Sequence, residues 1–454
     1  MDGAMNRTSP TLQLSTCICE TSYDSLGPET ISTVKRLIAD GVAVAVAGTG
    51  EAAPRLVAEY VREIACGPSA SVWGFGLRTS PLFAAYANAV SMHVLDFEPM
   101  SSPPTHAVSP TVPVALALAE AKRGDGKDVI VACAKGFETQ LRVLLASSHA
   151  RGSLPFHTPG VVGVLGSAAA ASHLLQLEPP QLANALGMAT SRCGGLPANT
   201  GSMVKCTHCG NAAAAGIEAS RLAQLGFTAN PGIFEAPSGY VGTFFPKHFD
   251  YDALLRFGQP FRCVDPGMAI KFYPSKYPTH FVITAALALH CRVKSPSDIL
   301  RINMVTPVIE DADRPQPRGG LEGKFSFQYT TAAALLDGRV GIDSFSDERR
   351  YRTDMVSLLD KISLVRDRTL SRDTKNMQVE VEVIMKDGSA YRETCSKPPG
   401  TWGIPVDPEQ HRRKVRDCLG VRMEERQLVR IIDMLDNLDR LSPDGIGELV
   451  TMLR

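Results

Sequence analysis

Two long segments of this chain are built mainly from small residues, and they constrain the fold more than any other feature. Val161–Leu175 consists mostly of glycine, alanine and valine, and Phe83–Leu95 is also rich in alanine. A helix without bulky side chains can approach its neighbours closely, as is typical of the middle of a helical core. We therefore predict that tightly packed helices form the centre of the protein.

Apolar residues recur at helical spacing along most of the first 255 residues. We expect the first twenty or so residues to be frayed, and almost no strands before about residue 255. Besides the two segments above, the predicted helices are Glu29–Ala47, Ala52–Ile64, Val112–Arg123, Gly126–Ser147, Pro179–Ser191 and Asn211–Leu225.

The pattern changes near Pro260. Ile299–Ile309 is rich in β-branched residues, and Met377–Met385 alternates apolar and acidic residues in its middle, which is typical of strands. Lys386–Gly388 has the composition of a hairpin turn, so Ala390–Thr394 is predicted to return as a paired strand. Two helices are predicted between these strands, at Tyr329–Leu336 and Asp354–Ile362.

Helical patterns return near the end of the chain, at Pro408–Leu419, Glu424–Leu438 and Ile446–Leu453. A chain of 454 residues is also longer than a single core usually allows. We therefore predict a mainly α protein with two domains. Residues 1–262 and 399–454 form a large all-helical domain, and residues 263–398 form a smaller α+β lid domain.

The composition excludes several classes of protein. Lys and Arg number 47, as do Asp and Glu, and the resulting net charge of zero argues against binding to nucleic acid. The eleven cysteines are odd in number and irregularly spaced, which indicates reduced thiols inside a cell. No apolar run is long enough to span a membrane, and no targeting signal is visible. We expect a cytoplasmic protein, with a mitochondrial location left open.

The stretch His93–His106 is predicted to be a helix end followed by a stiff, proline-rich loop. Loops held by rigid helices often carry chemistry, although Asp96 could simply cap a turn and the histidines could fill ordinary polar sites. The titratable side chains of this stretch are His93, Asp96, Glu98 and His106.

Other candidate residues lie in four further stretches. His157 precedes the Gly/Ala helix, Lys205 and His208 lie among small residues, and Tyr329 begins a predicted helix. The segment Pro266–His280, at the predicted domain junction, contributes Lys271, Lys276 and His280. Cys206 and Cys209 form a single CxxC pair, which is weak evidence for zinc because no second pair of ligands stands at the right spacing.

The sequence contains neither a nucleotide-binding fingerprint nor a GxSxG nucleophile motif. The polar inventory is therefore Asp, His, Lys and Tyr. Lysines and histidines can hold anionic groups, while other side chains move protons. This set suits proton transfer at a carbon next to a carboxylate.

Five motifs in the same order resemble the MmgE/PrpD family, and together they cover nearly the whole chain. They are HVLDF with the histidine of THAVSP, FHTPGVVGVLGSAAAA, GSMVKCTHCGNAAAAGIEASRLAQLGFTA, KFYPSKYPTH and EGKFSFQYTTAAALLDG. The family includes 2-methylcitrate dehydratase, cis-aconitate decarboxylase and iminodisuccinate epimerase. The resemblance implies a helical domain built from both ends of the chain, an α+β lid, a homodimer, and a site that needs no metal or organic cofactor.

The resemblance also implies the site residues. The catalytic positions are Asp96, His106, His157, Lys271 and Tyr329. The substrate-binding positions are Lys205, His208, Lys276 and His280. The chain departs from the family at LDFEPM, where many members have LDFDDT, and at Lys276, where others have His or Cys.

We therefore expect a cofactor-independent lyase for a citrate-like di- or tricarboxylic acid, with dehydration of 2-methylcitrate or a longer alkylcitrate as the first hypothesis. Decarboxylation of a cis-aconitate-like acid, epimerisation by α-proton transfer, and a non-catalytic paralogue are the alternatives. In this hypothesis Lys205 and Lys271 bind carboxylates, and one of His106, His157 or Lys271 takes the proton. Asp96 orients His106, and Tyr329 serves the leaving group.

Overall fold

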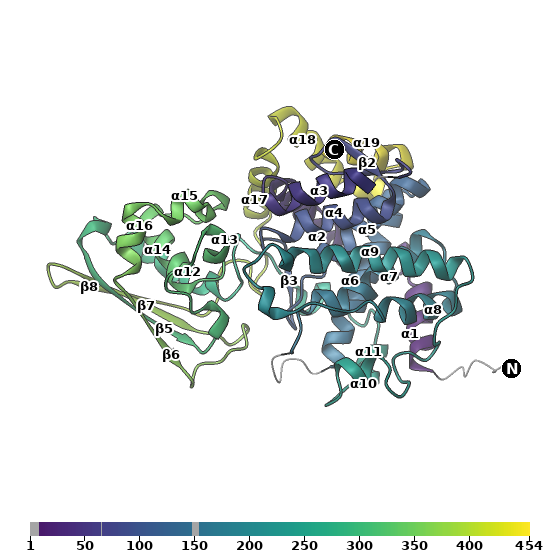
Figure 1. Cartoon of the computed structure of the whole chain (residues 1–454), viewed down its shortest axis with the longest axis horizontal. Coiled ribbons are helices and arrows are strands. Elements are labelled where there is room, and N and C mark those ends of the chain that lie inside the picture. Colours follow the sequence, from purple (N-terminus) through teal and green to yellow (C-terminus); the bar gives the residue numbers. More distant parts are fainter. Residues whose placement is uncertain (1–8, 65, 148–153) are drawn as a thin grey trace.

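A computed structural model describes residues 9–64, 66–147 and 154–454. Figure 1 shows a large body of helices beside a smaller unit that contains helices and one sheet. Each part has its own hydrophobic core: the core of the body combines Leu14–Ile270 with Val415–Leu453, and that of the lid extends from Ala269 to Cys395 and includes Met100. The predicted mainly α fold is confirmed. We propose that the two cores mark the two predicted domains.

The body contains the first eleven helices and the last three. They are α1 (Pro10–Glu20), α2 (Pro28–Gly48), α3 (Ala52–Ile64), α4 (Pro81–His93), α5 (Val108–Lys122), α6 (Gly126–Ala146), α7 (Pro159–Leu174), α8 (Pro179–Thr190), α9 (Val204–Gln224), α10 (Tyr240–Phe244), α11 (Tyr251–Leu255), α17 (Pro408–Gly420), α18 (Glu425–Asp436) and α19 (Pro443–Leu453). Among the described residues, none of the helices is both long and apolar enough to cross a membrane.

The small-residue helices lie at the centre of the body, as predicted. In α6 and α7, Gly136 and Gly166 face each other so closely that a Cβ on either would lie within 2.7 Å of the other's carbonyl oxygen. In α9, a Cβ at Gly216 would lie 2.3 Å from the Ser167 Cβ of α7. These backbones touch because no side chain separates them.

Helix α17, in the last segment of the chain, packs against α2, which lies near the other end of the chain. The buried Lys414 Nζ on α17 donates to both carboxylate oxygens of Asp40 on α2 at 2.8 Å, and to the Phe97 carbonyl at 2.9 Å. Phe97 belongs to the stretch His93–His106. The last segment of the chain therefore holds this loop in place.

The lid is one four-stranded sheet with helices packed against it (Figure 1). Its strands lie in the order β6-β5-β7-β8; β5 is parallel to β6 and antiparallel to β7, and β7 and β8 form the predicted hairpin. The elements are α12 (Thr279–His290), β5 (Ile299–Pro307), α13 (Gly320–Gly323), α14 (Phe327–Asp337), α15 (Asp347–Arg350), α16 (Thr353–Leu359), β6 (Ile362–Asp367), β7 (Val379–Met385) and β8 (Ala390–Cys395).

The structure corrects the expectation of a frayed N-terminus where residues are described. Helix α1 buries Leu14 and Ile18 completely, so residues 10–20 belong to the core. The rest of that expectation, for residues 1–8, lies outside the described residues.

The sequence analysis also missed several short elements. The hairpin of β1 (Ala70–Val72) and β2 (Leu77–Thr79) lies within the region expected to be almost free of strands. Helix α12 and strand β6 were not predicted either. Three-residue strands carry too little periodicity to be recognised, and β6 is largely exposed on the edge of the sheet, so it lacks a buried apolar face.

Candidate active site

A two-stranded ladder brings the loop after α4 next to the segment that carries Lys271. Strand β3 (Met100–Ser101) pairs antiparallel with β4 (Met268–Ala269). Because Lys271 follows β4 by two residues, this pairing places it beside Asp96, which is 175 positions earlier in the chain. Two predicted site segments therefore meet at the junction of body and lid.

Asp96 is the centre of the site. Its backbone has a φ of 50°, a left-handed conformation that Asp and Asn tolerate better than most residues. Lys205 Nζ, from the first turn of α9, donates to Asp96 Oδ2 at 2.7 Å. Lys271 Nζ donates to Asp96 Oδ1 and, at 2.5 Å, to its backbone carbonyl. Two ammonium groups therefore share a single buried carboxylate.

These contacts control the protonation of the three groups. Burial alone would raise the pKa of Asp96, but Lys205 and Lys271 hold it well below its usual range. Burial lowers the pKa of Lys271, although Asp96 opposes that shift. For Lys205 the attraction of Asp96 outweighs burial, and the pKa is raised. Asp96 is therefore ionised, and Lys205 is the more firmly charged of the two lysines.

A second carboxylate, Glu98, connects the histidines of the same loop. Glu98 is fully buried, and its Oε1 accepts hydrogen bonds from His93 Nδ1 and, at 2.7 Å, from Ser109 Oγ. His106 lies between the two acids: its Nδ1 is 3.0 Å from Glu98 Oε1, and its Nε2 is 3.6 Å from Asp96 Oδ1. The loop thus forms one continuous polar network.

His157 and His208 extend the network beyond His93. Their Nδ1 atoms are 3.0 Å apart, so one ring donates a hydrogen bond to the other. The rings of His93 and His157 have centroids 5.5 Å apart. Burial, followed by the charge of Lys205, holds the pKa of His157 well below its usual range and lowers that of His208. Both imidazoles are therefore neutral at pH 7.

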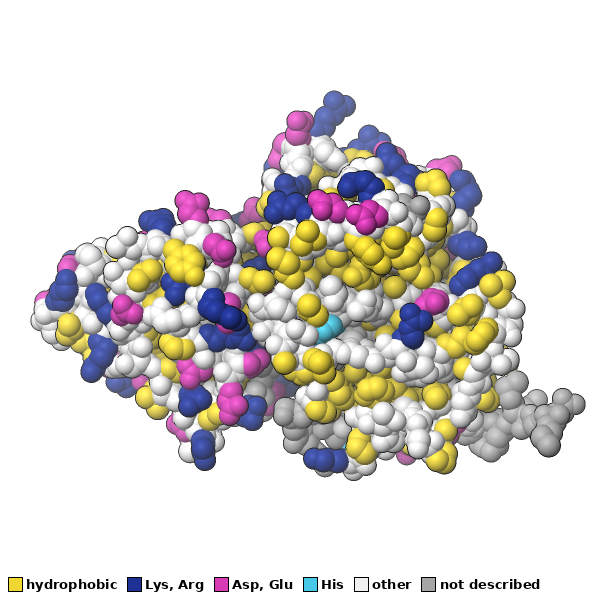
Figure 2. Space-filling view, in the orientation of Figure 1, with side chains coloured by type: hydrophobic (Ala, Val, Ile, Leu, Met, Phe, Trp, Pro, Cys, Tyr) yellow, Lys and Arg dark blue, Asp and Glu magenta, His cyan; other side chains and the backbone are white. Residues whose placement is uncertain are grey.

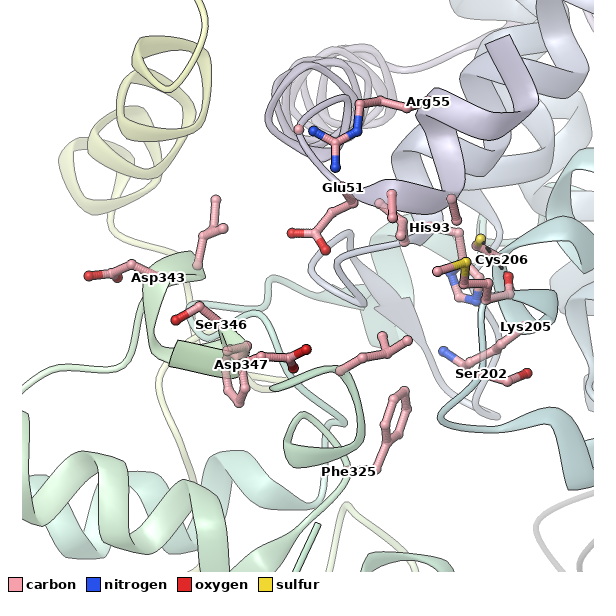
Figure 3. Close-up of a pocket in the computed structure, with 18 residues that line it drawn as sticks. Glu51, Arg55, His93, Ser202, Lys205, Cys206, Phe325, Asp343, Ser346 and Asp347 are labelled. Carbon is pink, nitrogen blue, oxygen red and sulfur yellow. Dashed lines mark hydrogen bonds between the residues drawn. The ribbon is translucent and has the colours of Figure 1, made fainter. Parts of the chain in front are cut away.

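A cavity of about 540 Å³ separates body and lid beside this network. The body contributes His93, Lys205 and Glu51, and the lid contributes Phe325 and residues of the segment Ile342–Asp347 (Figure 3). Lys205 Nζ also lies 5.2 Å from the centroid of the Phe325 ring. The cavity is large enough for a small organic acid, with a cationic wall on the side of the body.

Seven of the nine predicted site residues gather at this junction, and two are placed differently. Six of them make the contacts above: Asp96, His106, His157, Lys205, His208 and Lys271. The seventh, His280, is fully buried, and its pKa is lowered first by burial and then by the positive charge of Lys271. Lys276 is half-buried and pairs with Asp311.

Tyr329 is the clearest departure from the expected site. It is fully buried in the core of the lid, and its hydroxyl donates to the Ser344 carbonyl at 2.6 Å. In the described part of the chain, no hydrogen bond or ring contact joins Tyr329 to the Asp96 network. Its proton is committed to the lid backbone, so the geometry does not support a catalytic role.

Sequence reasoning did not include His93 or Glu98 among the site residues, although both lie in the loop it singled out. The spacing of five residues between them, across a proline-ended helix, allows the loop to fold back and pair them. It also missed Phe325, because a single aromatic residue in a lid carries no recognisable pattern.

His93, Glu98 and His106 are the described residues best placed to hold a metal ion, with one ligand atom from each lying within 4.8 Å of the others. Ligands 2.0–2.1 Å from a tetrahedral zinc ion stand about 3.3 Å apart. Glu98 instead bonds His93 directly, and lies 3.0 Å from His106 Nδ1. Glu98 is thus hydrogen-bonded to His93 and lies beside His106, and the metal-free site stays a prediction.

The buried His93 makes the stability of the protein depend on pH. Burial is the main reason that the pKa of His93 is lowered to about 4. An unfolded chain binds this proton below about pH 6.5, whereas the folded protein binds it only near pH 4. We expect the free energy of unfolding to fall as the pH drops from 6.5 to 4, by up to about 3 kcal/mol from His93 alone.

Denaturant titrations at several pH values test this expectation with His93→Asn, because the asparagine amide can still donate to Glu98. The variant is expected to show a shallower decline than the wild type. His173→Asn, at the far end of α7, is the control and should keep the full decline. An unchanged decline in His93→Asn would contradict the assignment.

The fold and the site together define a class of protein: a helical body and an α+β lid that enclose a site of lysines, histidines and one shared carboxylate. The sequence matches two family models. Residues 12–252 match the MmgE/PrpD N-terminal domain, and residues 273–440 match the MmgE/PrpD C-terminal domain. The chain belongs to the MmgE/PrpD family.

Several relatives align over most of both chains. The cis-aconitate decarboxylase of Mus musculus is 33% identical over 427 residues, which cover 90% of this chain and 87% of the mouse protein. That of Homo sapiens is 31% identical over 98% of this chain and 95% of its own length. That of Aspergillus terreus is 25% identical over 95% of this chain and 93% of its own length.

Proposed function

We propose that this protein is a lyase that decarboxylates cis-aconitate or a closely similar tricarboxylic acid. The observation that carries the proposal is the shared carboxylate: Lys205 and Lys271 both bind Asp96 beside neutral histidines, at a cavity between body and lid. Relatives that align along nearly the whole chain are named cis-aconitate decarboxylases, which supports the same reaction.

The proposed reaction breaks the carbon–carbon bond between the CH₂ carbon and its carboxylate, and carbon dioxide leaves. The freed electron pair forms a new double bond, while the electrons of the old one move to the carbon beside a second carboxylate. That carbon takes up one proton. A trianion and a proton therefore give carbon dioxide and a dianion with a terminal CH₂ group. The catalyst must stabilise the transient negative charge and supply the proton.

The side chains of the network divide these tasks. Lys205 and Lys271 bind substrate carboxylates and stabilise the negative charge that develops on them. Asp96 holds both ammonium groups in position, and His106 lies within reach of it. His157 delivers the proton, because it is partly exposed at the edge of the network. Tyr329 supports the lid and takes no part in the chemistry.

A proton NMR time course tests the proposal directly. Purified protein is incubated in deuterium oxide with cis-aconitate, citrate, 2-methylcitrate or a longer alkylcitrate. We expect cis-aconitate to give vinylidene proton signals as carbon dioxide is released, and we expect the spectra of the citrates not to change. An unsaturated product from a citrate would favour the dehydratase that the sequence placed first. Deuterium exchange without conversion would favour an epimerase, and four unchanged spectra would favour a non-catalytic paralogue.

We also propose that the protein forms a homodimer through an apolar face of the body. Figure 2 shows hydrophobic side chains gathered over the body. The exposed hydrophobic residues of the body include Leu56 and Tyr60 of α3, and Met203 and Val204 at the start of α9. Helix α4 contacts both of these helices, and we infer that the exposed residues belong to one apolar face. A contiguous apolar face of this kind marks an interaction site, which measurement of the mass in solution tests.

A further inference from the structure

Lys324 is a buried lysine of the lid whose ammonium group forms no hydrogen bond or ion pair with another described residue. It follows the short helix α13, and only 1% of its surface is exposed. Its Nζ has no hydrogen-bond partner among the residues that the structure describes. The other buried lysines of the described chain all have one: Lys135, Lys205, Lys271 and Lys414 each donate to an oxygen atom.

The side chain lies in the lid beside residues that line the cavity. Its neighbour Phe325 lines the cavity, and Lys324 Nζ lies 6.0 Å from the ring centroid of Phe345, which also lines it. Burial lowers the pKa of Lys324; the charges of Glu51 and Asp96 oppose that shift, and the charge of Lys205 adds to it. All three residues come from the body, so the ammonium group lies toward the junction.

The backbone around Lys324 is firmly held. Its N–H donates to the Gly320 carbonyl at 3.2 Å, and its own carbonyl accepts from Lys276 N–H at 2.9 Å. Lys276 is the residue that replaces the family's His or Cys, and its ammonium group is neutralised by Asp311. Lys324 is therefore held in place near the cavity as its remaining unpaired lysine charge.

A buried ammonium group without a partner destabilises a protein unless something supplies the missing negative charge. Asp96 does not supply it, because its oxygens accept from Lys205 and Lys271 and no hydrogen bond joins them to Lys324. Lys205 and Lys271 can each bind one carboxylate, so a substrate with three carboxylates has one anionic group that they do not bind. The unpaired lysine and the third carboxylate are complementary in number and in charge.

We propose that Lys324 is a substrate-binding residue of the lid, which binds one carboxylate of a tricarboxylic acid while Lys205 and Lys271 bind the others. This inference rests on the proposed function for the class of substrate. It also gives the lid a direct part in selecting tricarboxylates over dicarboxylates. The substrate then bridges the two domains.

Isothermal titration calorimetry with propane-1,2,3-tricarboxylate tests the proposal without turnover, because this saturated acid has no double bond to rearrange. Lys324→Met is expected to weaken binding about 10- to 100-fold, the loss typical of one charge-assisted hydrogen bond. Lys324→Gln serves as a second neutral variant, and Lys294→Met, at an exposed lysine of the lid, is the matched control. Without ligand, Lys324→Met should unfold at the same or a higher temperature than the wild type.

Two outcomes would overturn the proposal. One is unchanged affinity in both Lys324 variants, or a wild type that does not bind the acid. The other concerns Glu51, the carboxylate whose charge acts most strongly on Lys324. Glu51→Gln should leave binding unchanged or tighter, because it removes a negative charge from the cavity wall. If Glu51→Gln instead weakens binding as much as Lys324→Met, Lys324 affects binding through Glu51, and a direct contact between Lys324 and the acid is rejected.

The same data separate this inference from the proposed function. Binding of the tricarboxylate that depends on Lys324, in a protein that leaves cis-aconitate unchanged, would reject decarboxylation and keep the binding site. Decarboxylation of cis-aconitate together with undiminished binding in the Lys324 variants would keep the proposed reaction and reject Lys324 as a substrate-binding residue.

Discussion

Replacing His157 with glutamine is expected to lower kcat for cis-aconitate about 10²–10⁴-fold while the protein stays folded. In the free protein, burial and the charge of Lys205 keep the imidazole neutral. A trianionic substrate placed against Lys205 offsets that positive charge, so protonation of His157 becomes more favourable in the complex. Glutamine can still hydrogen-bond to His208 but cannot transfer a proton at neutral pH.

The dependence on pH gives this prediction a second readout. Because the protonated imidazole is required and its pKa in the free protein lies below 6.5, kcat/KM is expected to fall as the pH rises from 6 to 8. The His157→Gln variant should lose this decline along with its activity. His173→Gln, at the other end of α7, is the control and should match the wild type. Full turnover in His157→Gln would leave another group as the proton donor.

The body could be predicted from the sequence because its helices are long and periodic. Helix α3 occurs at the residues predicted, Ala52–Ile64, and Val161–Leu175 differs from α7 by only a few residues. The contact between Gly136 and Gly166 shows why small residues were informative. The pairing of β3 with β4 could not be predicted, because two-residue strands have no pattern and their positions in the chain are far apart.

The candidate site was predicted where motifs concentrate several polar residues, and missed where single residues act through the fold. Asp96, Lys205 and Lys271 were each visible in a motif, and the fold brings them together. Tyr329 stands in an equally clear motif, but its hydroxyl is used by the lid backbone. That Lys324 Nζ forms no hydrogen bond with another described residue is revealed only by the packed structure.

The second large effect is expected at Asp96. Replacing Asp96 with asparagine should lower the free energy of unfolding by about 3–5 kcal/mol, because it leaves the buried ammonium groups of Lys205 and Lys271 without their shared carboxylate. Asparagine tolerates the left-handed backbone at this position as aspartate does, so the substitution changes the charge and leaves the turn intact. Urea or guanidinium titration measures the loss.

Asp311→Asn is the matched control, since it removes the carboxylate from the ion pair with Lys276. The Asp311 side chain is 51% exposed, so solvent screens that pair and the expected loss is below about 1 kcal/mol. A loss of that small size in Asp96→Asn would contradict the central role given to this carboxylate.

The double variant Asp96→Asn/Lys271→Met separates the charge from the geometry of the site. In Asp96→Asn, Lys271 is a fully buried ammonium group near Lys205. Among the described residues, the hydrogen bond that it keeps is the one to the backbone carbonyl of residue 96. Removing its charge should therefore recover part of the lost stability, although each single substitution destabilises the protein. Turnover should not recover, because the second carboxylate-binding group is also lost. Recovery of stability without activity would establish that Asp96 is retained to keep two cations together, a pairing that substrate carboxylates then exploit.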